Sequence, residues 1–155
     1  IMCVGKAMTG GFMTMAATLA TAKVAEGMSP RALMHGPTFM ANPLACAVSA
    51  EATALILEGN WREQVAGIEK QLQRGFEGLS EEPGGADVRV LGAIGVVEME
   101  CDVNMSAATA AAVAQGVWLR PFGRLIYIMP PFISTADEIA QMCRGVRAAV
   151  AGGRQ

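Results

Sequence analysis

The sequence has 155 residues, of which 52% are hydrophobic and 17% are charged, and its formal net charge is −2. It contains no block of Lys and Arg, which argues against a nucleic-acid-binding surface because such surfaces need clustered basic residues. No run reaches the ~20 apolar residues that a membrane-spanning helix needs. The four cysteines stand far apart, without a paired motif or a His/Cys cluster, so we expect free thiols, no metal site and a reducing, cytoplasmic location.

The first third of the chain is predicted to contain two strands and little regular helix. Its apolar start, Ile1–Val4, has no polar lead-in and leads us to expect a segment of a longer protein. Residues 1–5 are expected to form a short buried strand, and Phe12–Thr21 a second strand after the Gly-Gly turn at 10–11. Glycine and proline interrupt Val24–Met34, which therefore predicts a short helix and a loop.

Two helices are predicted to follow. Asn42 is a favourable N-cap with Pro43 at the first helical position, and this helix is expected to run to about Glu58. Asn60 opens the next helix, with Glu63 at the reciprocal capping-box position. The apolar residues of this second helix recur at intervals of three or four, namely Trp61, Val65, Ile68, Leu72, Phe76 and Leu79.

A polar turn at Glu81–Gly85 is the best candidate for a domain boundary, which divides the chain into residues 1–80 and 81–155. The second part is predicted to be a small α/β domain in the order β-β-α-β-β-α. Its predicted elements are strands Val88–Leu91 and Ile94–Met99, an alanine-rich helix capped by Ser106, strands Val117–Phe122 and Leu125–Met129, and a last helix that begins at a capping box of Thr135 and Glu138.

Lys6 is the leading candidate for chemistry. It lies between Gly5 and the Gly-Gly turn, inside an apolar run, where its amine would be at a strand end and partly out of water. Desolvation favours the neutral, nucleophilic amine, which is the form that condenses with an aldehyde cofactor. The same position also fits a lysine whose side chain simply reaches water.

Three stretches together resemble a known family. They are GKAMTGG at residues 5–11, HGPTFMANPLACA at 35–47 and WLRPF at 118–122. This combination is similar to the C-terminal part of a class III, fold-type I aminotransferase that depends on pyridoxal 5'-phosphate. The resemblance implies an α/β fold in which residues 1–80 end the large cofactor-binding domain and residues 81–155 form the small C-terminal domain.

The resemblance also implies a role for each matching residue. Lys6 would form the Schiff base with the cofactor and would then move protons as base and acid. Pro37 and Thr38 would bind the cofactor, with the Thr38 hydroxyl donating to its phosphate in the neighbouring subunit of a homodimer. Gly36 would lie against the substrate, and Arg120 would bind a substrate carboxylate through its planar guanidinium. Taken without the resemblance, Thr38 also fits an ordinary turn and Arg120 a surface position.

Within the family, Pro37 and WLRPF are similar to the branch that works in biotin biosynthesis. Its small-molecule substrates are S-adenosylmethionine and 8-amino-7-oxononanoate. Ala41 departs from the pattern, in which we expect glycine before Asn42. Two alternatives stay open: another class III aminotransferase, acting on ornithine, 4-aminobutyrate or a diamine, and a non-catalytic interaction domain in which Lys6 is structural.

Overall fold

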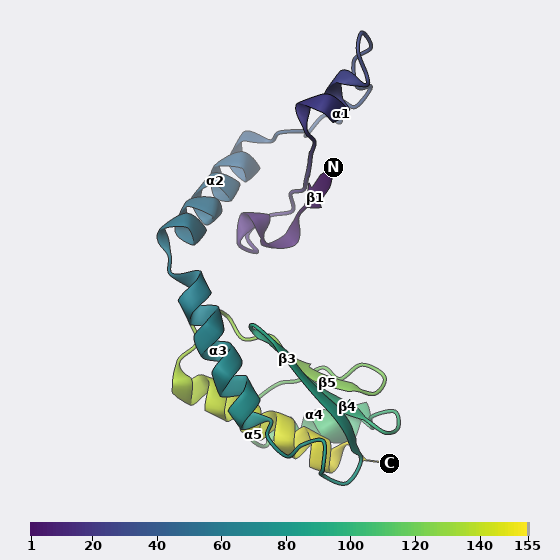
Figure 1. Ribbon diagram of the computed structural model, residues 1–155, viewed down its shortest axis with the longest axis vertical. Helices are drawn as coiled ribbons and strands as arrows, with labels where there is room; N and C mark the ends of the chain where they lie inside the picture. The colour runs from purple at the N-terminus through teal and green to yellow at the C-terminus, as the bar shows by residue number, and fades with distance from the viewer. Residues whose placement is uncertain (155) are drawn as a thin grey trace. The chain divides into compact units, whose positions relative to one another are not determined.

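The structure is a computed structural model that describes residues 1–154 (Figure 1). Its chain divides between Asn60 and Trp61 into two units. The division falls before helix α3 (Trp61–Gly75) and not at residue 81, because α3 packs on helix α5 (Ala136–Gly152) and on two strands of the second unit. None of the helices in the described range is long and apolar enough to cross a membrane.

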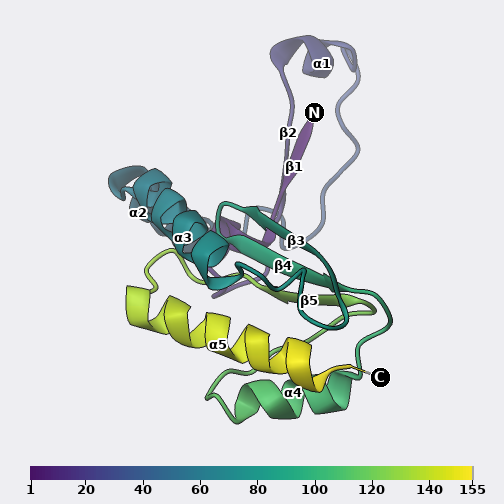
Figure 2. The same ribbon diagram turned by 60° about the horizontal axis from the view of Figure 1, so that its bottom comes forward.

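The first unit is built on a small antiparallel hairpin. Strand β1 (Met2–Val4) pairs with strand β2 (Ala17–Leu19), with Val4 opposite Ala17. The 3-10 helix η1 (Lys6–Thr9) follows β1, and helix α1 (Ala22–Glu26) follows β2 (Figure 2). The predicted strand at Phe12–Thr21 is correct only in its last part, because turns and bends occupy the residues that follow the Gly-Gly pair.

Helix α2 (Pro43–Glu58) completes the first unit and confirms the predicted start and end. The Asn42 side-chain oxygen accepts hydrogen bonds from the backbone N–H groups of Leu44 and Ala45, at 3.0 and 3.2 Å. Gly59 follows the last turn. The helix contacts η1 and buries small residues, Ala45 and Ser49, while most of its leucines are exposed.

The second unit has a three-stranded antiparallel sheet in the order β3-β4-β5, with bounds Gly85–Leu91, Ile94–Met99 and Leu125–Ile128. Helices α3 and α5 pack against each other and against the sheet, and α4 (Met105–Val113) lies beside α5 (Figure 2). One hydrophobic core joins these elements. Its fully buried members include Leu72, Phe76, Val97, Ile126, Ile139 and Val146.

Two local predictions for this unit need correction. The N-cap of α4 is Asn104 and not Ser106: its side chain accepts a hydrogen bond from the Ala107 N–H at 3.2 Å. Residues 117–122 do not form the expected strand and make only an isolated bridge at Phe122, consistent with Pro121, which has no N–H for a ladder. The capping box of Thr135 and Glu138 is confirmed, as is the last helix.

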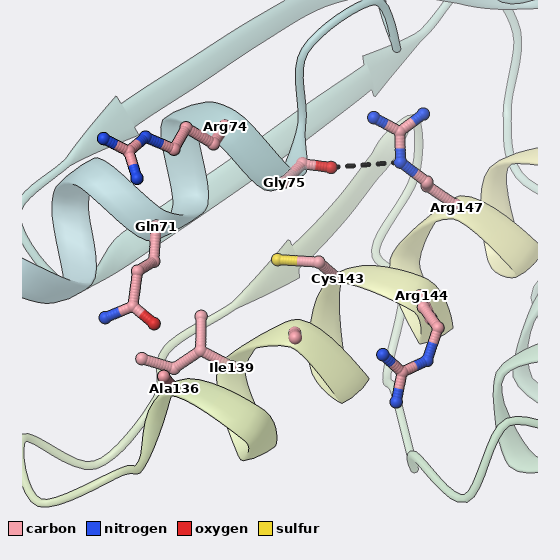
Figure 3. A pocket seen from close by; sticks show the side chains of 9 residues that line it. Gln71, Arg74, Gly75, Ala136, Ile139, Cys143, Arg144 and Arg147 are labelled. Carbon is pink, nitrogen blue, oxygen red and sulfur yellow. Dashed lines mark hydrogen bonds between the residues drawn. The ribbon is translucent and has the colours of Figure 1, made fainter.

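Helices α3 and α5 approach each other closely at Gly75 (Figure 3). A side-chain carbon added there would collide with the Cys143 sulfur. Arg147 crosses the same contact, donating from Nε to the Gly75 carbonyl at 3.1 Å and from Nη2 to the Glu77 carbonyl at 2.6 Å. Burial raises the pKa of the Cys143 thiol, and the charges of Arg147 and Arg144 partly oppose that rise.

Candidate functional site

Lys6 lies at the junction between strand β1 and η1, as the first residue of the 3-10 helix. Its backbone adopts φ +47°, in the left-handed region that is uncommon for residues other than glycine. Such strained residues persist only when the surrounding structure holds them, and they cluster at functional sites. The backbone of Lys6 is therefore an independent structural indication that this position is specialised.

Lys6 is exposed in the part of the chain that the structure describes. The prediction that its amine is partly out of water is therefore wrong for this chain. The apolar residues before it do not cover it, because Ile1, Met2 and Cys3 are exposed as well. An apolar neighbourhood in sequence shields an amine only where the chain folds back over it. The amine of Lys6 is accessible to a reactant from outside the chain.

The turn after Lys6 is fixed by short-range hydrogen bonds. The Met8 N–H donates to the Gly5 carbonyl at 3.1 Å, and the Gly10 N–H donates to the Ala7 carbonyl at 3.0 Å. Gly10 and Gly11 have φ +59° and +85°, which suits glycine in both places. Thr9, which the sequence analysis did not single out, is fully buried, and its hydroxyl donates to the Met13 carbonyl.

The loop that carries Gly36, Pro37 and Thr38 ends in a tight turn before α2. All three residues are exposed. The Met40 N–H donates to the Pro37 carbonyl at 2.9 Å, and Ala41 follows with φ +54°. The left-handed conformation of Ala41 gives a physical reason for the expectation of glycine at this place.

A cavity of about 350 Å³ lies between residues 14–16 and the second motif stretch of the first unit. One wall is formed by Thr14, Met15 and Ala16. The other is formed by part of the second stretch, and Gly36 and Thr38 are not in it; its residues are His35, Pro37, Phe39, Met40, Ala41, Asn42 and Ala45. Gly5 contacts the first wall, since a carbon added to Gly5 would lie 3.5 Å from the Ala16 side chain. The structure thus brings Pro37 to the cavity and Gly5 to its first wall, whereas Lys6, Gly36 and Thr38 do not line it.

Arg120 lies in the second unit, between α4 and β5, and its side chain is exposed. Its neighbours hold the backbone in place. Leu119 is buried, and its carbonyl accepts a hydrogen bond from the Thr109 hydroxyl at 3.2 Å, while Pro121 is buried on the other side. The guanidinium is therefore presented from an anchored segment, and its role in substrate binding stays a prediction.

A second hollow lies between α3 and α5. It measures about 430 Å³, and three arginines line it, namely Arg74, Arg144 and Arg147. Their guanidiniums point in different directions around the groove, and that of Arg147 binds the end of α3 (Figure 3). The three guanidiniums therefore do not converge on one point where an anion could bind. Across residues 1–154, no group of three or more His, Cys, Asp or Glu side chains is placed to hold a metal ion.

The first unit contains donors that fit a phosphorylated aldehyde cofactor. Lys6 supplies an accessible primary amine, which can condense with an aldehyde. Thr38 supplies an exposed hydroxyl that can donate to a phosphate, and Gly36 leaves open space where a side chain would begin. The donor chemistry therefore agrees with pyridoxal 5'-phosphate.

Comparison with known proteins also points to the class III aminotransferases. A family model described as aminotransferase class-III matches residues 1–150. Adenosylmethionine-8-amino-7-oxononanoate aminotransferase from Corynebacterium glutamicum is 60% identical over 98% of this chain, which spans 37% of that relative. The enzyme of the same name from Methanocaldococcus jannaschii has a crystal structure that matches 99% of the chain, with a TM-score of 0.86 and 25% identity. An amine transaminase from an uncultivated Pseudomonas species, in its PLP-bound form, matches 98% of this chain and 38% of its own, with a TM-score of 0.88 and 25% identity.

Proposed function

Because this chain belongs to the class III aminotransferases, a family of PLP-dependent enzymes, we propose that it is the lysine-bearing part of an aminotransferase of biotin biosynthesis. The observation that carries the proposal is the accessible amine of Lys6 on a strained backbone, in one unit with the loop of Thr38. The chain spans about a third of the length of the curated relatives it matches, so the activity is assigned to the full-length protein.

In this proposal the residues bind, orient and transfer protons. Lys6 would hold the cofactor through its amine and, when that amine is free, would act as the base and then the acid for the substrate proton. Thr38 donates its hydroxyl to the cofactor phosphate in the partner subunit of a homodimer, and Pro37 shapes the same loop. The bound cofactor supplies an electron sink for the carbon that loses its proton.

Substrate binding is assigned to Gly36 and Arg120. Gly36 lacks a side chain, so the substrate can approach the backbone closely. The guanidinium of Arg120 forms a bidentate pair with the carboxylate of 8-amino-7-oxononanoate, and S-adenosylmethionine is the amino donor. We propose a cytoplasmic location for the assembled enzyme.

The central test is covalent trapping of the cofactor in the full-length protein. Borohydride reduction followed by peptide mass analysis should place the adduct on Lys6. Lys6→Ala should abolish the adduct and the visible absorbance band. Lys23→Ala removes an exposed lysine of the same unit and should leave both unchanged. An adduct on another lysine, or none in the unsubstituted protein, would overturn the assignment.

The amino donor is tested by spectroscopy. S-adenosylmethionine should convert the bound cofactor to its amine form, whereas ornithine and 4-aminobutyrate should not. Conversion by ornithine or 4-aminobutyrate alone would assign the protein to another activity of the same family. The isolated 155-residue chain should have negligible transaminase activity, and measurable turnover by it would contradict the assignment of the activity to the full-length protein.

A further inference from the structure

We propose that Thr9 is a positioning residue for Lys6, an inference that rests on the function proposed for that lysine. Thr9 is the third residue after Lys6 and ends the 3-10 helix that begins there. It is fully buried, unlike the exposed lysine. The buried hydroxyl of Thr9 would hold the backbone that presents the amine.

Thr9 makes two hydrogen bonds that close the turn. Its hydroxyl donates to the Met13 carbonyl, and its own carbonyl accepts from the Phe12 N–H at 3.1 Å. Gly10 and Gly11, both with positive φ, form the bend between the two bonded ends. One buried residue therefore fixes the whole loop between η1 and the segment that returns toward β2.

The hydroxyl bond also connects Lys6 to the cavity of the site. Met13 directly precedes Thr14, Met15 and Ala16, which form the wall facing the loop of Pro37. On the other side, η1 packs on α2, whose N-terminus ends that loop. Thr9 thus ties the turn of Lys6 to the wall that faces the loop of Pro37, and the 3-10 helix that Thr9 ends packs on α2.

The strained backbone of Lys6 gives this link its consequence. A residue with φ +47° relaxes unless its surroundings hold it. Without the hydroxyl, the Met13 carbonyl would lose a hydrogen-bond partner near a buried position, and the turn would rearrange to reach water. The amine of Lys6 would then move relative to its reactants, and a displacement of about 1 Å costs up to about 100-fold in rate.

The test compares Thr9→Val with Thr9→Ser in the full-length protein loaded with cofactor. Valine keeps the shape of threonine and removes the hydroxyl, while serine keeps the hydroxyl. Thr21→Val is the matched control, because Thr21 is exposed and its side chain makes no capping hydrogen bond. The readouts are borohydride trapping at Lys6, the pH midpoint of the visible absorbance band, and kcat separated from KM.

We expect Thr9→Val to form the adduct but to shift the pH midpoint and to lower kcat by about 10- to 100-fold, with KM for the amino donor nearly unchanged. Thr9→Ser and Thr21→Val should match the unsubstituted protein. An unchanged pH midpoint and kcat in Thr9→Val would overturn the inference. Absence of the adduct in the unsubstituted protein would overturn the assignment of Lys6 itself and, with it, this inference.

A second variant decides the question if Thr9→Val does not fold. Gly11→Ala adds a methyl group that meets no atom within 4 Å, but it strains a backbone with φ +85°. It disturbs the same turn from its exposed side, without touching the buried hydroxyl. We expect Gly11→Ala to shift the pH midpoint of the absorbance band and to lower kcat, and an unchanged midpoint with unchanged kcat would overturn the role of the turn.

Discussion

The two units of the chain differ in what holds them together. In the second unit a continuous core runs from Ile68 to Val150 and joins three helices to a sheet. In the first unit, the buried residues among 1–60 are Thr9, Ala45 and Ser49, and large apolar side chains such as Phe39 lie exposed. The unit with the core supplies stability, whereas the unit with the candidate site is shaped by turns, caps and positive-φ positions.

The largest effect should come from removing core volume in the second unit. Leu72→Ala should lower the free energy of unfolding by about 2–5 kcal/mol, because Leu72 is fully buried. Leu91→Ala in β3 is the matched control, since Leu91 is 77% exposed in the same unit, and should change it by less than about 0.5 kcal/mol. Urea unfolding followed by tryptophan fluorescence measures this, because Trp61 and Trp118 both belong to the second unit. Equal effects of the two substitutions on the free energy of unfolding would contradict the role of the buried core.

Close helix packing should give the next largest effect. Gly75→Ala should destabilise the second unit by about 1–3 kcal/mol, because the added carbon collides with the Cys143 sulfur. Gly67→Ala lies in the same helix, and its added carbon meets nothing within 4 Å. It should stabilise the unit by about 0.5–1 kcal/mol through helix propensity. Thermal unfolding should show a lowered midpoint for Gly75→Ala and a raised midpoint for Gly67→Ala. A change of the same sign in both variants would contradict the close contact at Gly75.

A smaller effect is expected at the turn before α2. Ala41→Gly should stabilise the first unit by about 1 kcal/mol or less, because glycine adopts φ +54° without a steric penalty. Hydrogen exchange of the α2 amides should slow accordingly. Ala47→Gly, inside α2, is the control and should speed exchange. Faster exchange in Ala41→Gly would show that the turn is not a source of strain.

The smallest effect concerns acid sensitivity in the second unit. Hydrogen bonds from the Thr135 backbone N–H and hydroxyl lower the pKa of Glu138 below 4.5. A lowered pKa in the folded state stabilises the protein above the unfolded pKa, and this contribution is lost as the pH falls through the folded pKa.

Glu138→Gln should therefore lower the thermal midpoint at pH 7, and its difference from the unsubstituted protein should shrink below about pH 4.5. Glu81→Gln, at an exposed loop position, is the control and should show a smaller difference at pH 7. A difference for Glu138→Gln that stays constant down to pH 3 would contradict the capping-box explanation.

Local signals in the sequence predicted much of the fold, because caps and turns act over a few residues. Asn42 and the pair of Thr135 with Glu138 marked helix starts correctly. The start of α4 was misplaced, since Asn104 and Ser106 are both good caps and only the observed hydrogen bond distinguishes them. Site motifs could likewise be recognised as patterns of residues.

The properties that depend on distant contacts could not be predicted. The exposure of Lys6 is set by what folds over it, and an apolar neighbourhood along the chain does not determine that. The burial of Thr9 depends on the packing of η1 against α2, for which a threonine in a short polar turn gives no signal. The Gly-Gly pair after Thr9 was the only hint that its position is constrained.

Because Cys143 packs closely against Gly75, the rate at which its thiol is labelled can report how often α3 and α5 separate. Cys143 is 5% exposed, whereas Cys3 and Cys101 are exposed and Cys46 is partly exposed, so these three would react with a thiol reagent before it. The slow phase of labelling would then record how often this helix pair opens, without an engineered probe.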